Sequence, residues 1–364
     1  MMRFAFFGSS LVSAYWNGAA TYYRGLLRAL AERGHRIAFY EPDAFNRQAN
    51  RDIPDPAWAS VQVYQPTEDS ALRMLEHART ADVIVKASGV GVLDAFLERA
   101  VLDLQGPGRT IVFWDVDAPA TLERVAADQD DPFRALIGRY DAVFTYGGGD
   151  PVIDAYGRLG ARACIPIYNA LDEESHKPVS PQPAFAADLS FLGNRLPDRE
   201  ARVHEFLLKP ARLLPHRSFL LGGSGWEPDM MPANVRAIGH VFTADHNAFN
   251  CSATTVLNVT RDSMVRFGHS PATRIFEAAG AGACLITDAW DGIERFLEPG
   301  REVLVARNGE DVVAFVESTD AVEARRIGRA ARKAVLAKHT YRSRAAEVEQ
   351  ALSGSGRAAH VKAS

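Results

Sequence analysis

The 364-residue chain has few cysteines, no long apolar run and no strong excess of charge. Its three cysteines, Cys164, Cys251 and Cys284, are far apart and odd in number, which argues against a disulfide framework or a zinc site and favours a reducing, cytoplasmic location. No apolar stretch approaches the roughly 20 residues that span a bilayer. The first residues, MMRFAFFGSS, predict a strand and not a signal peptide. The net charge of -4 argues against nucleic acid as the main partner.

A complete dinucleotide-binding fingerprint is also missing. The stretch GSSLVS at 8–13 lacks the second glycine, and SGVGVLD at 88–94 contains only a G-x-G fragment. Because the fingerprint needs all its glycines to bring the backbone close to a pyrophosphate, these stretches argue against an NAD-dependent dehydrogenase.

Short apolar runs alternate with segments of helical spacing through both halves of the chain. This alternation predicts an α/β protein whose parallel sheets carry helices on both faces, and 47% hydrophobic residues suffice for two cores. The expected strands are 4–7, 37–40, 82–87, 110–114, 141–145, 163–167, 189–192, 219–221, 235–238, 255–259, 283–287 and 302–305.

Between the two halves, the proline-rich stretch IYNALDEESHKPVSPQP at 167–183 shows neither a helix nor a strand pattern, so it predicts a linker. We expect a first domain at 1–168, a linker at 169–184 and a second domain at 185–338. A C-terminal helix at 339–352, able to cross back to the first domain, and a flexible tail at 353–364 complete the expected organisation.

The most informative stretch is GHSPATRIFEAAGAGACLITD at 268–288. Ser270 suits a helix N-cap and Pro271 the first helical position, while Arg274 and Glu277 lie three residues apart on one face. A helix start favours phosphate, and a carboxylate one turn later can accept hydrogen bonds from sugar hydroxyls. The stretch predicts a nucleoside-diphosphate ligand, with an ordinary capped helix carrying a surface Arg–Glu pair as the alternative.

Four other expected strands also end in polar or glycine-rich loops. These loops read DVDAPAT after 110–114, GNRLPDRE after 189–192, GGSGW after 219–221 and TRDSM after 255–259. Ligands of open parallel sheets bind beyond the carboxyl ends of the strands, so these loops are where a site is expected, although each alone could be ordinary turn chemistry.

Several of these segments together resemble the spore-maturation CgeB-like glycosyltransferases, over nearly the whole chain. The segments are SPATRIFEAAGAGACLITD with DGIERFLEPGREVLVA, the WDVDAP loop at 114–119, FLGNRLPDRE at 191–200 and KHTYRSRAAEVEQAL near the end. The resemblance implies the GT-B fold, in which two Rossmann-like, doubly wound parallel-sheet domains face each other across a cleft. It also implies transfer of a sugar from a UDP-, dTDP- or GDP-sugar to an acceptor hydroxyl or other nucleophile, on a small molecule, glycan or protein, without an obligatory metal or a tightly bound cofactor.

The resemblance places the donor in the second domain. Glu277 resembles the second glutamate of a two-glutamate signature and would hold the donor ribose, whereas the position of the first glutamate, which contacts the transferred sugar, is His269. His269 could hydrogen-bond a sugar hydroxyl or the diphosphate, or only satisfy its loop. Arg195 falls where similar transferases place a basic residue against the diphosphate, with Arg199 as the second candidate and a surface ion pair as the alternative. The remaining expected donor residues are Gly223, His240, Val241, Arg261, Ser270 and Arg274.

The first domain is expected to bind the acceptor. Asp117, preferred over Asp115, could act as general base if the reaction inverts, and loop capping is the alternative for both aspartates. Tyr15, Trp16, Asn17 and Gly18 follow the first strand, where aromatic rings could stack on a sugar or an aglycone, or serve only as a hydrophobic staple.

A metal site is not expected in the second domain, because the spacing of His240, Asp245 and His246 matches no known zinc pattern. Two alternatives to a transferase remain open. One is a GT-B nucleotide-sugar epimerase, which shares the donor site but lacks an acceptor. The other is a non-catalytic nucleotide-sugar-binding protein, against which the retained Arg195, Arg274 and Glu277 argue.

Overall fold

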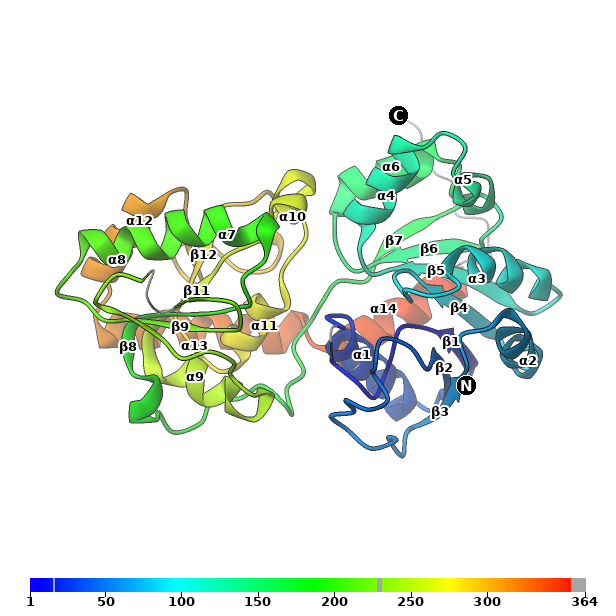
Figure 1. Ribbon diagram of the computed structural model, residues 1–364, viewed down its shortest axis with the longest axis horizontal. Helices are drawn as coiled ribbons and strands as arrows, with labels where there is room; N and C mark the ends of the chain where they lie inside the picture. Colours follow the sequence, from blue (N-terminus) through cyan, green and yellow to red (C-terminus); the bar gives the residue numbers. More distant parts are fainter. Residues whose placement is uncertain (16, 228–230, 355–364) are drawn as a thin grey trace. The chain divides into compact units, whose positions relative to one another are not determined.

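A computed structural model describes residues 1–15, 17–227 and 231–354. The chain divides into two compact units. Unit 1 combines Met1–Tyr168 with the C-terminal stretch that begins at Tyr341, and unit 2 is Asn169–Thr340. Each unit is built around one parallel sheet with helices packed on it (Figure 1).

The sheet of unit 1 has the strand order β3-β2-β1-β4-β5-β6-β7, and every neighbouring pair is parallel. Its strands are β1 (Arg3–Phe7), β2 (Arg36–Pro42), β3 (Ala59–Tyr64), β4 (Val83–Ala87), β5 (Thr110–Asp115), β6 (Ala142–Thr145) and β7 (Cys164–Pro166). The chain builds outward from β1 in one direction and then from β4 in the other. The loops after β1 and β4 therefore lie at the point where the strand order reverses, which is where such sheets bind ligands.

Seven α-helices are described in unit 1. They are α1 (Ala20–Glu32), α2 (Glu68–Ala78), α3 (Asp94–Ala100), α4 (Ala118–Ala127), α5 (Pro132–Ile137), α6 (Gly149–Arg158) and α14 (Tyr341–Gly354), and the 3-10 turn η1 (Val101–Leu104) follows α3. Helix α14 returns to pack beside α1, where a Cβ added to Gly25 would lie only 2.2 Å from Tyr341 Cδ2. Glu349 of the same helix pairs with Arg33 and His35, at 2.5 and 2.7 Å. The C-terminal helix is thus part of unit 1.

The sheet of unit 2 has the order β10-β9-β8-β11-β12-β13 and is again parallel throughout. Its strands are β8 (Ala187–Leu192), β9 (Phe219–Gly222), β10 (Val235–Ala237), β11 (Ala253–Asn258), β12 (Leu285–Asp288) and β13 (Leu304–Ala306). The strand order reverses between β8 and β11. A ligand of this sheet is therefore expected beside the loops that follow these two strands.

The helices of unit 2 begin with a continuous run made of α7 (Pro197–Val203), the π-helical turn η3 (His204–Leu208) and α8 (Lys209–Leu213). The others are α9 (His246–Ser252), α10 (Asp262–Phe267), α11 (Thr273–Gly280), α12 (Gly309–Ser318) and α13 (Ala321–Lys338), with 3-10 turns η2 (Pro183–Phe185), η5 (Thr243–Asp245) and η6 (Ile293–Arg295).

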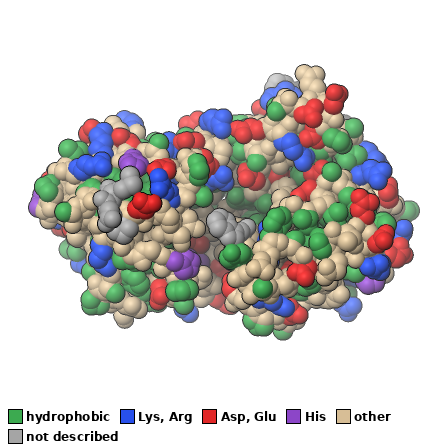
Figure 2. Space-filling view, viewed as in Figure 1, with side chains coloured by type: hydrophobic (Ala, Val, Ile, Leu, Met, Phe, Trp, Pro, Cys, Tyr) green, Lys and Arg blue, Asp and Glu red, His purple; other side chains and the backbone are tan. Residues whose placement is uncertain are grey.

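Charged side chains of both signs are interspersed over the surface in view (Figure 2). This mixture agrees with the small net charge of the chain. Among the helices of the described ranges, none combines the length and the apolar character needed to cross a membrane.

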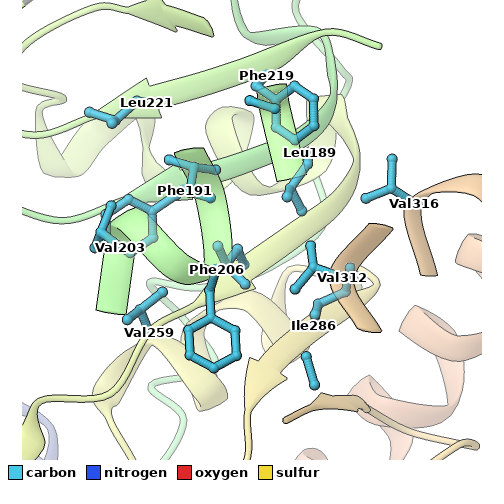
Figure 3. Close-up of a cluster of buried hydrophobic side chains, with 14 of the residues drawn as sticks. Leu189, Phe191, Val203, Phe206, Phe219, Leu221, Val259, Ile286, Val312 and Val316 are labelled. Carbon is cyan, nitrogen blue, oxygen red and sulfur yellow. The ribbon is translucent and has the colours of Figure 1, made fainter. Parts of the chain in front are cut away.

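One face of the unit 2 sheet is covered by a large apolar core (Figure 3). Leu189 of β8 and Leu221 of β9 point into it, together with Phe206 of the π-helical turn and Val312 of α12. Each such side chain contributes roughly 1.5–3 kcal/mol when it is removed from water. This core fixes the strands whose carboxyl ends carry the candidate site.

Every strand expected from the sequence is present within a few residues of its expected limits, and β3 is an addition. Its sequence, ASVQVY, keeps most side chains partly or fully exposed because β3 is an edge strand paired only with β2. A strand of that kind has no continuous apolar run to reveal it. The C-terminal helix expected at 339–352 is α14, which begins at Tyr341 because His339 and Thr340 separate it from α13.

Candidate functional site

The carboxyl edge of the unit 2 sheet brings together arginines from three segments. Arg199 lies in α7, after β8; Arg261 follows β11; and Arg274 lies in α11. Arg261 and Arg274 are both close enough to Arg199 to act on its pKa electrostatically. The switch point of this sheet is therefore lined by positive charge, as an anionic ligand requires.

Helix α11 begins later than the sequence predicts. Its first residue is Thr273 and its N-cap is Ala272, which makes no side-chain capping hydrogen bond, so the expectation that Ser270 caps the helix is wrong. The reason lies in the preceding backbone. His269 has a φ of 44°, and its N–H donates to the Asp291 carbonyl at 2.6 Å, which holds this stretch against the loop after β12.

Glu277 is a buried carboxylate of α11 with no conventional hydrogen-bond donor. Its side chain is 12% exposed, Arg274 Nη1 lies 3.2 Å from Oε2, and His176 Nε2 lies 3.7 Å from Oε1. Burial alone would raise the pKa of Glu277, but Arg274, His176 and His246 together lower it. Glu277 is therefore charged at neutral pH, while within the described ranges no side chain or backbone group donates a hydrogen bond to it.

Several buried polar atoms of α11, of the stretch before it and of α7 make no hydrogen bond among the described residues, although Arg274 Nη1 is ion-paired with Glu277. They are Arg274 Nε and Nη1, Ser270 Oγ, His269 Nδ1 and Arg199 Nε. A buried polar atom that loses its water without gaining a partner costs roughly 1–3 kcal/mol. An oxygen-rich anion seated here would supply acceptors for the arginine and serine donors among these atoms.

The histidine that replaces the expected glutamate is tightly held. A Cβ added to Gly292 would lie 2.0 Å from His269 Nδ1, so only glycine leaves room for the imidazole. His269 thus has a fixed position directly before α11, on the same edge as Glu277 and Ser270.

The two arginines after β8 differ in their surroundings. Arg195 forms a partly exposed ion pair with Glu200 at 2.7 Å. Arg199 lies over the Phe191 ring at 5.6 Å, donates from Nη2 to the Asn194 carbonyl at 2.5 Å, and forms no ion pair with a described carboxylate. Burial lowers the pKa of Arg199 although Asp198 acts in the opposite direction. The geometry therefore favours Arg199, the second candidate of the sequence, as a phosphate ligand.

Hydrogen bonds orient Arg261 and the residue before it. Arg261 Nε donates a hydrogen bond to Asp198 at 2.6 Å, and the two side chains form an ion pair. The preceding Thr260 is held by Asp288 at the end of β12, which accepts hydrogen bonds from the Thr260 N–H and hydroxyl and from Arg202. The loop after β11 is therefore fixed before any ligand arrives.

The loops after β9 and β10 contain three of the expected donor residues, Gly223, His240 and Val241. Gly223 has a φ of 127°, and a Cβ there would lie 2.2 Å from the Gly193 carbonyl, so the loops after β8 and β9 touch. Val241 is buried, whereas His240 packs edge-on against Phe242, which is 68% exposed. An exposed ring at this position can stack on a planar base.

His246 and His176 are two residues near Glu277 whose role the sequence does not reveal. Burial first, and then Arg274, lowers the pKa of His246 to about 4, although Glu277 acts in the opposite direction. Its Nδ1 and the Nδ1 of His176 have no hydrogen-bond partner in the described structure. The spacing of the two histidines in the sequence does not predict that they lie near Glu277. His176 belongs to the expected linker, and only folding brings it to α11.

In unit 1, Asp115 is enclosed at the end of β5. Its Oδ1 accepts hydrogen bonds from Ser88 Oγ, Thr121 Oγ1 and the Asp117 N–H, at 2.7, 3.0 and 3.0 Å, and its Oδ2 accepts from Tyr156 Oη at 2.5 Å. Burial raises the pKa of Asp115, although these hydrogen bonds act to lower it. This geometry favours the loop-organising alternative over direct contact with an acceptor.

Asp117 occupies the N-cap position of α4, but its side chain makes no capping hydrogen bond. It is only partly buried, at the carboxyl edge of the unit 1 sheet. Unlike Asp115, Asp117 is therefore placed so that a substrate could approach its carboxylate.

The loop after β1 is rigidly held by Asn17. Its Oδ1 accepts from Ser9 Oγ, and its Nδ2 donates to the Ser10 and Ser13 carbonyls, each at 2.9 Å. Tyr15 is 43% exposed, and nothing lies within 4 Å of a Cβ added to Gly18. Trp16 lies outside the described residues.

Within the described part of the chain, no group of three or more His, Cys, Asp or Glu side chains is arranged to hold a metal ion. The three cysteines are free.

Part of the chain is similar to a known protein family. Residues 199–350 match the family model described as glycosyl transferase-like. No curated protein sequence matches the chain. Among solved structures, sucrose-phosphate synthase from Thermosynechococcus elongatus is similar over 99% of this chain and 100% of its own, with 14% identity and a TM-score of 0.71. The fold is GT-B.

Two further GT-B structures show the same likeness. HepE from Anabaena, in a complex with UDP and glucose, covers 97% of this chain and 100% of its own, at 14% identity and a TM-score of 0.67. The β-glucosyltransferase of phage T4 covers 97% and 99%, at 12% identity and a TM-score of 0.60. The expected fold class, with two parallel-sheet α/β domains, is therefore confirmed, and these identities speak for the architecture alone.

Proposed function

We propose that the protein is a glycosyltransferase that takes its sugar from a nucleoside-diphosphate sugar bound to unit 2. The observation that carries this proposal is Glu277, a buried, charged carboxylate without a hydrogen-bond donor among the described residues. The cis-diol of a ribose offers two donors to such a carboxylate. The glycosyl transferase-like match includes Glu277, and the complexes of HepE contain UDP and UDP-glucose.

The buried donors of Ser270, Arg274 and Arg199 that make no hydrogen bond among the described residues suit the diphosphate. Ser270 Oγ and the guanidinium of Arg274 precede the carboxylate, and Arg199 brings a second guanidinium without a carboxylate partner. Negative charge grows on the nucleoside diphosphate as its bond to the sugar breaks, and fixed arginines stabilise that charge without reorganisation. Arg261 and Arg195 remain candidates for the outer phosphate contacts.

The acceptor hydroxyl attacks the anomeric carbon as the bond to the diphosphate breaks. In an inverting reaction Asp117 takes the hydroxyl proton, because its side chain is only partly buried at the carboxyl edge of the unit 1 sheet. In a retaining reaction Asp117 positions the acceptor, and His269 contacts the transferred sugar where other enzymes have glutamate. We further propose the CgeB-like subgroup and a cytoplasmic location.

Titration calorimetry with UDP, dTDP and GDP tests the donor assignment. We expect one nucleotide to bind the wild-type protein and Glu277→Gln to weaken it by at least about tenfold, since two charge-assisted hydrogen bonds are lost. The matched control is Glu323→Gln in α13, which also removes a glutamate three residues from an arginine but lies on the surface. Unchanged affinity of Glu277→Gln would remove this residue from the site, and no binding of any of the three nucleotides would refute the proposal.

A further inference from the structure

Two adjacent residues after β2 have a backbone conformation that L-residues avoid. Phe45 has a φ of 54° and Asn46 a φ of 59°. A side chain in this left-handed region crowds the backbone, and the strain persists only where surrounding contacts hold it. Strained positions of this kind concentrate at functional sites.

The contacts that hold Phe45 come from the switch point of unit 1. A Cβ added to Gly91, in the loop after β4, would lie 2.6 Å from Phe45 Cε2, so the ring rests directly on this glycine. The Arg47 guanidinium carbon lies 4.9 Å from the centroid of the same ring. Arg47 in turn donates to the carbonyls of Ser9 and Val90, at 3.3 and 3.2 Å, in the loops after β1 and β4.

Burial of the ring does not explain this arrangement. Phe45 remains 52% exposed although its backbone is strained and its ring is fixed from two sides. The Arg47 side chain that holds the ring is buried, since it is 6% exposed. Its Nε has no hydrogen-bond partner among the described residues. The strained backbone therefore holds an aromatic surface open to solvent at the edge where sheets of this kind bind ligands.

We propose that Phe45 is a stacking platform for the acceptor. The acceptor presents the face of a ring, either a pyranose or an aryl group, to the switch point of unit 1. This inference rests on the proposed function only in naming the ligand an acceptor. The stacking role of Phe45 does not depend on it. An aromatic ring offers a pyranose or aryl face a large apolar contact at little cost in flexibility, because it has only two rotatable bonds.

The test uses three probes in saturation-transfer NMR at millimolar concentration: methyl β-D-glucopyranoside, 4-nitrophenol and 4-nitrophenyl β-D-glucopyranoside. We expect wild-type protein to bind at least one, Phe45→Tyr to retain that affinity and Phe45→Gly to weaken it about fivefold or more, since stacking is lost. Binding of the methyl glucoside identifies a sugar ring as the partner, and binding of 4-nitrophenol identifies an aryl ring.

The neighbouring residue provides the matched control. Glycine tolerates a positive φ, so Asn46→Gly relieves the same kind of backbone strain but keeps the Phe45 ring, and only Phe45→Gly should lose the probe. Undiminished probe binding by Phe45→Gly would overturn the platform, as would wild-type protein that binds none of the three probes.

UDP calorimetry on the same variants separates this inference from the proposed function. Nucleotide affinity should be equal in wild type, Phe45→Gly and Asn46→Gly, because Phe45 lies in unit 1 and the expected nucleotide site in unit 2. Probe binding without any nucleotide binding would leave the platform standing and refute the donor assignment.

Discussion

At the scale of single residues, Asp115 and Glu277 are buried carboxylates with opposite surroundings. Asp115 accepts four hydrogen bonds from its own unit, and burial raises its pKa. Glu277 accepts none within the described chain, and although burial acts to raise its pKa, Arg274 first and then the neighbouring histidines lower it. A saturated carboxylate organises protein, whereas an unsaturated one is available to a ligand.

This contrast predicts different effects on stability. Asp115→Ala leaves the hydroxyls of Ser88, Thr121 and Tyr156 without their acceptor, so we expect the free energy of unfolding to fall by about 3–5 kcal/mol. Glu277→Gln breaks no hydrogen bond but removes the carboxylate that is ion-paired with Arg274 at 3.2 Å, so we expect a smaller loss, of about 1–3 kcal/mol. Urea unfolding followed by circular dichroism measures both. An Asp115→Ala protein of normal stability that has lost only acceptor turnover would instead assign Asp115 to the acceptor.

His246 predicts the pH dependence of stability. Its pKa is lowered from 6.5 to about 4 in the folded protein, so below pH 6.5 the unfolded chain binds a proton that the folded chain does not. Stability should therefore fall by up to roughly 1.4 kcal/mol per pH unit as the pH decreases from 6.5 towards 4. Arg274, Glu277 and His176 also face this imidazole and are unchanged in the comparison.

The matched variant is His246→Gln, which cannot take up the proton. Its free energy of unfolding, measured in urea across the same pH range, should decline less steeply than that of the wild type. Parallel slopes for the two proteins would show that another group carries the acid limb.

At the scale of secondary-structure elements, the docking of α14 on α1 depends on one glycine. Gly25→Ala places a methyl group where the Tyr341 ring lies, so the helix must shift, and we expect a loss of about 1–3 kcal/mol in the stability of unit 1. Gly157→Ala in α6 is the control, because nothing lies within 4 Å of its Cβ, and it should stabilise by about 0.5–1 kcal/mol. Equal stability of the two variants, measured by urea unfolding, would show that α14 does not pack as described.

The elements were largely predictable, because buried parallel strands have continuous apolar sequences and the loops after them are polar. The site was predictable only in part. Glu277 and Arg274 stand in one recognisable segment, whereas the start of α11 depends on a backbone contact with Asp291, far along the chain. His176 and Phe45 acquire their positions through long-range contacts with Glu277 and Gly91, and no local pattern encodes such contacts.

At the scale of the whole molecule, each unit has its own sheet, so the two should respond separately to ligand. In differential scanning calorimetry, a nucleotide at about 100 times its dissociation constant should stabilise unit 2 by about 2.7 kcal/mol and leave unit 1 unchanged. Gly25→Ala should lower the transition of unit 1 and thereby identify it. A nucleotide that shifts the Gly25-sensitive transition would place the nucleotide site in the wrong unit.

The return of the chain to unit 1 also has a consequence for biosynthesis. Asn169–Thr340 is, in topological terms, an insertion between the sheet of unit 1 and its last helix. On the ribosome, residues 1–168 emerge before unit 2. The whole of unit 2 must then be synthesised before Tyr341 of α14 can pack against Gly25 and Tyr22. Unit 2 can therefore finish folding first, although its synthesis begins later, and unit 1 matures only after α14 has been synthesised.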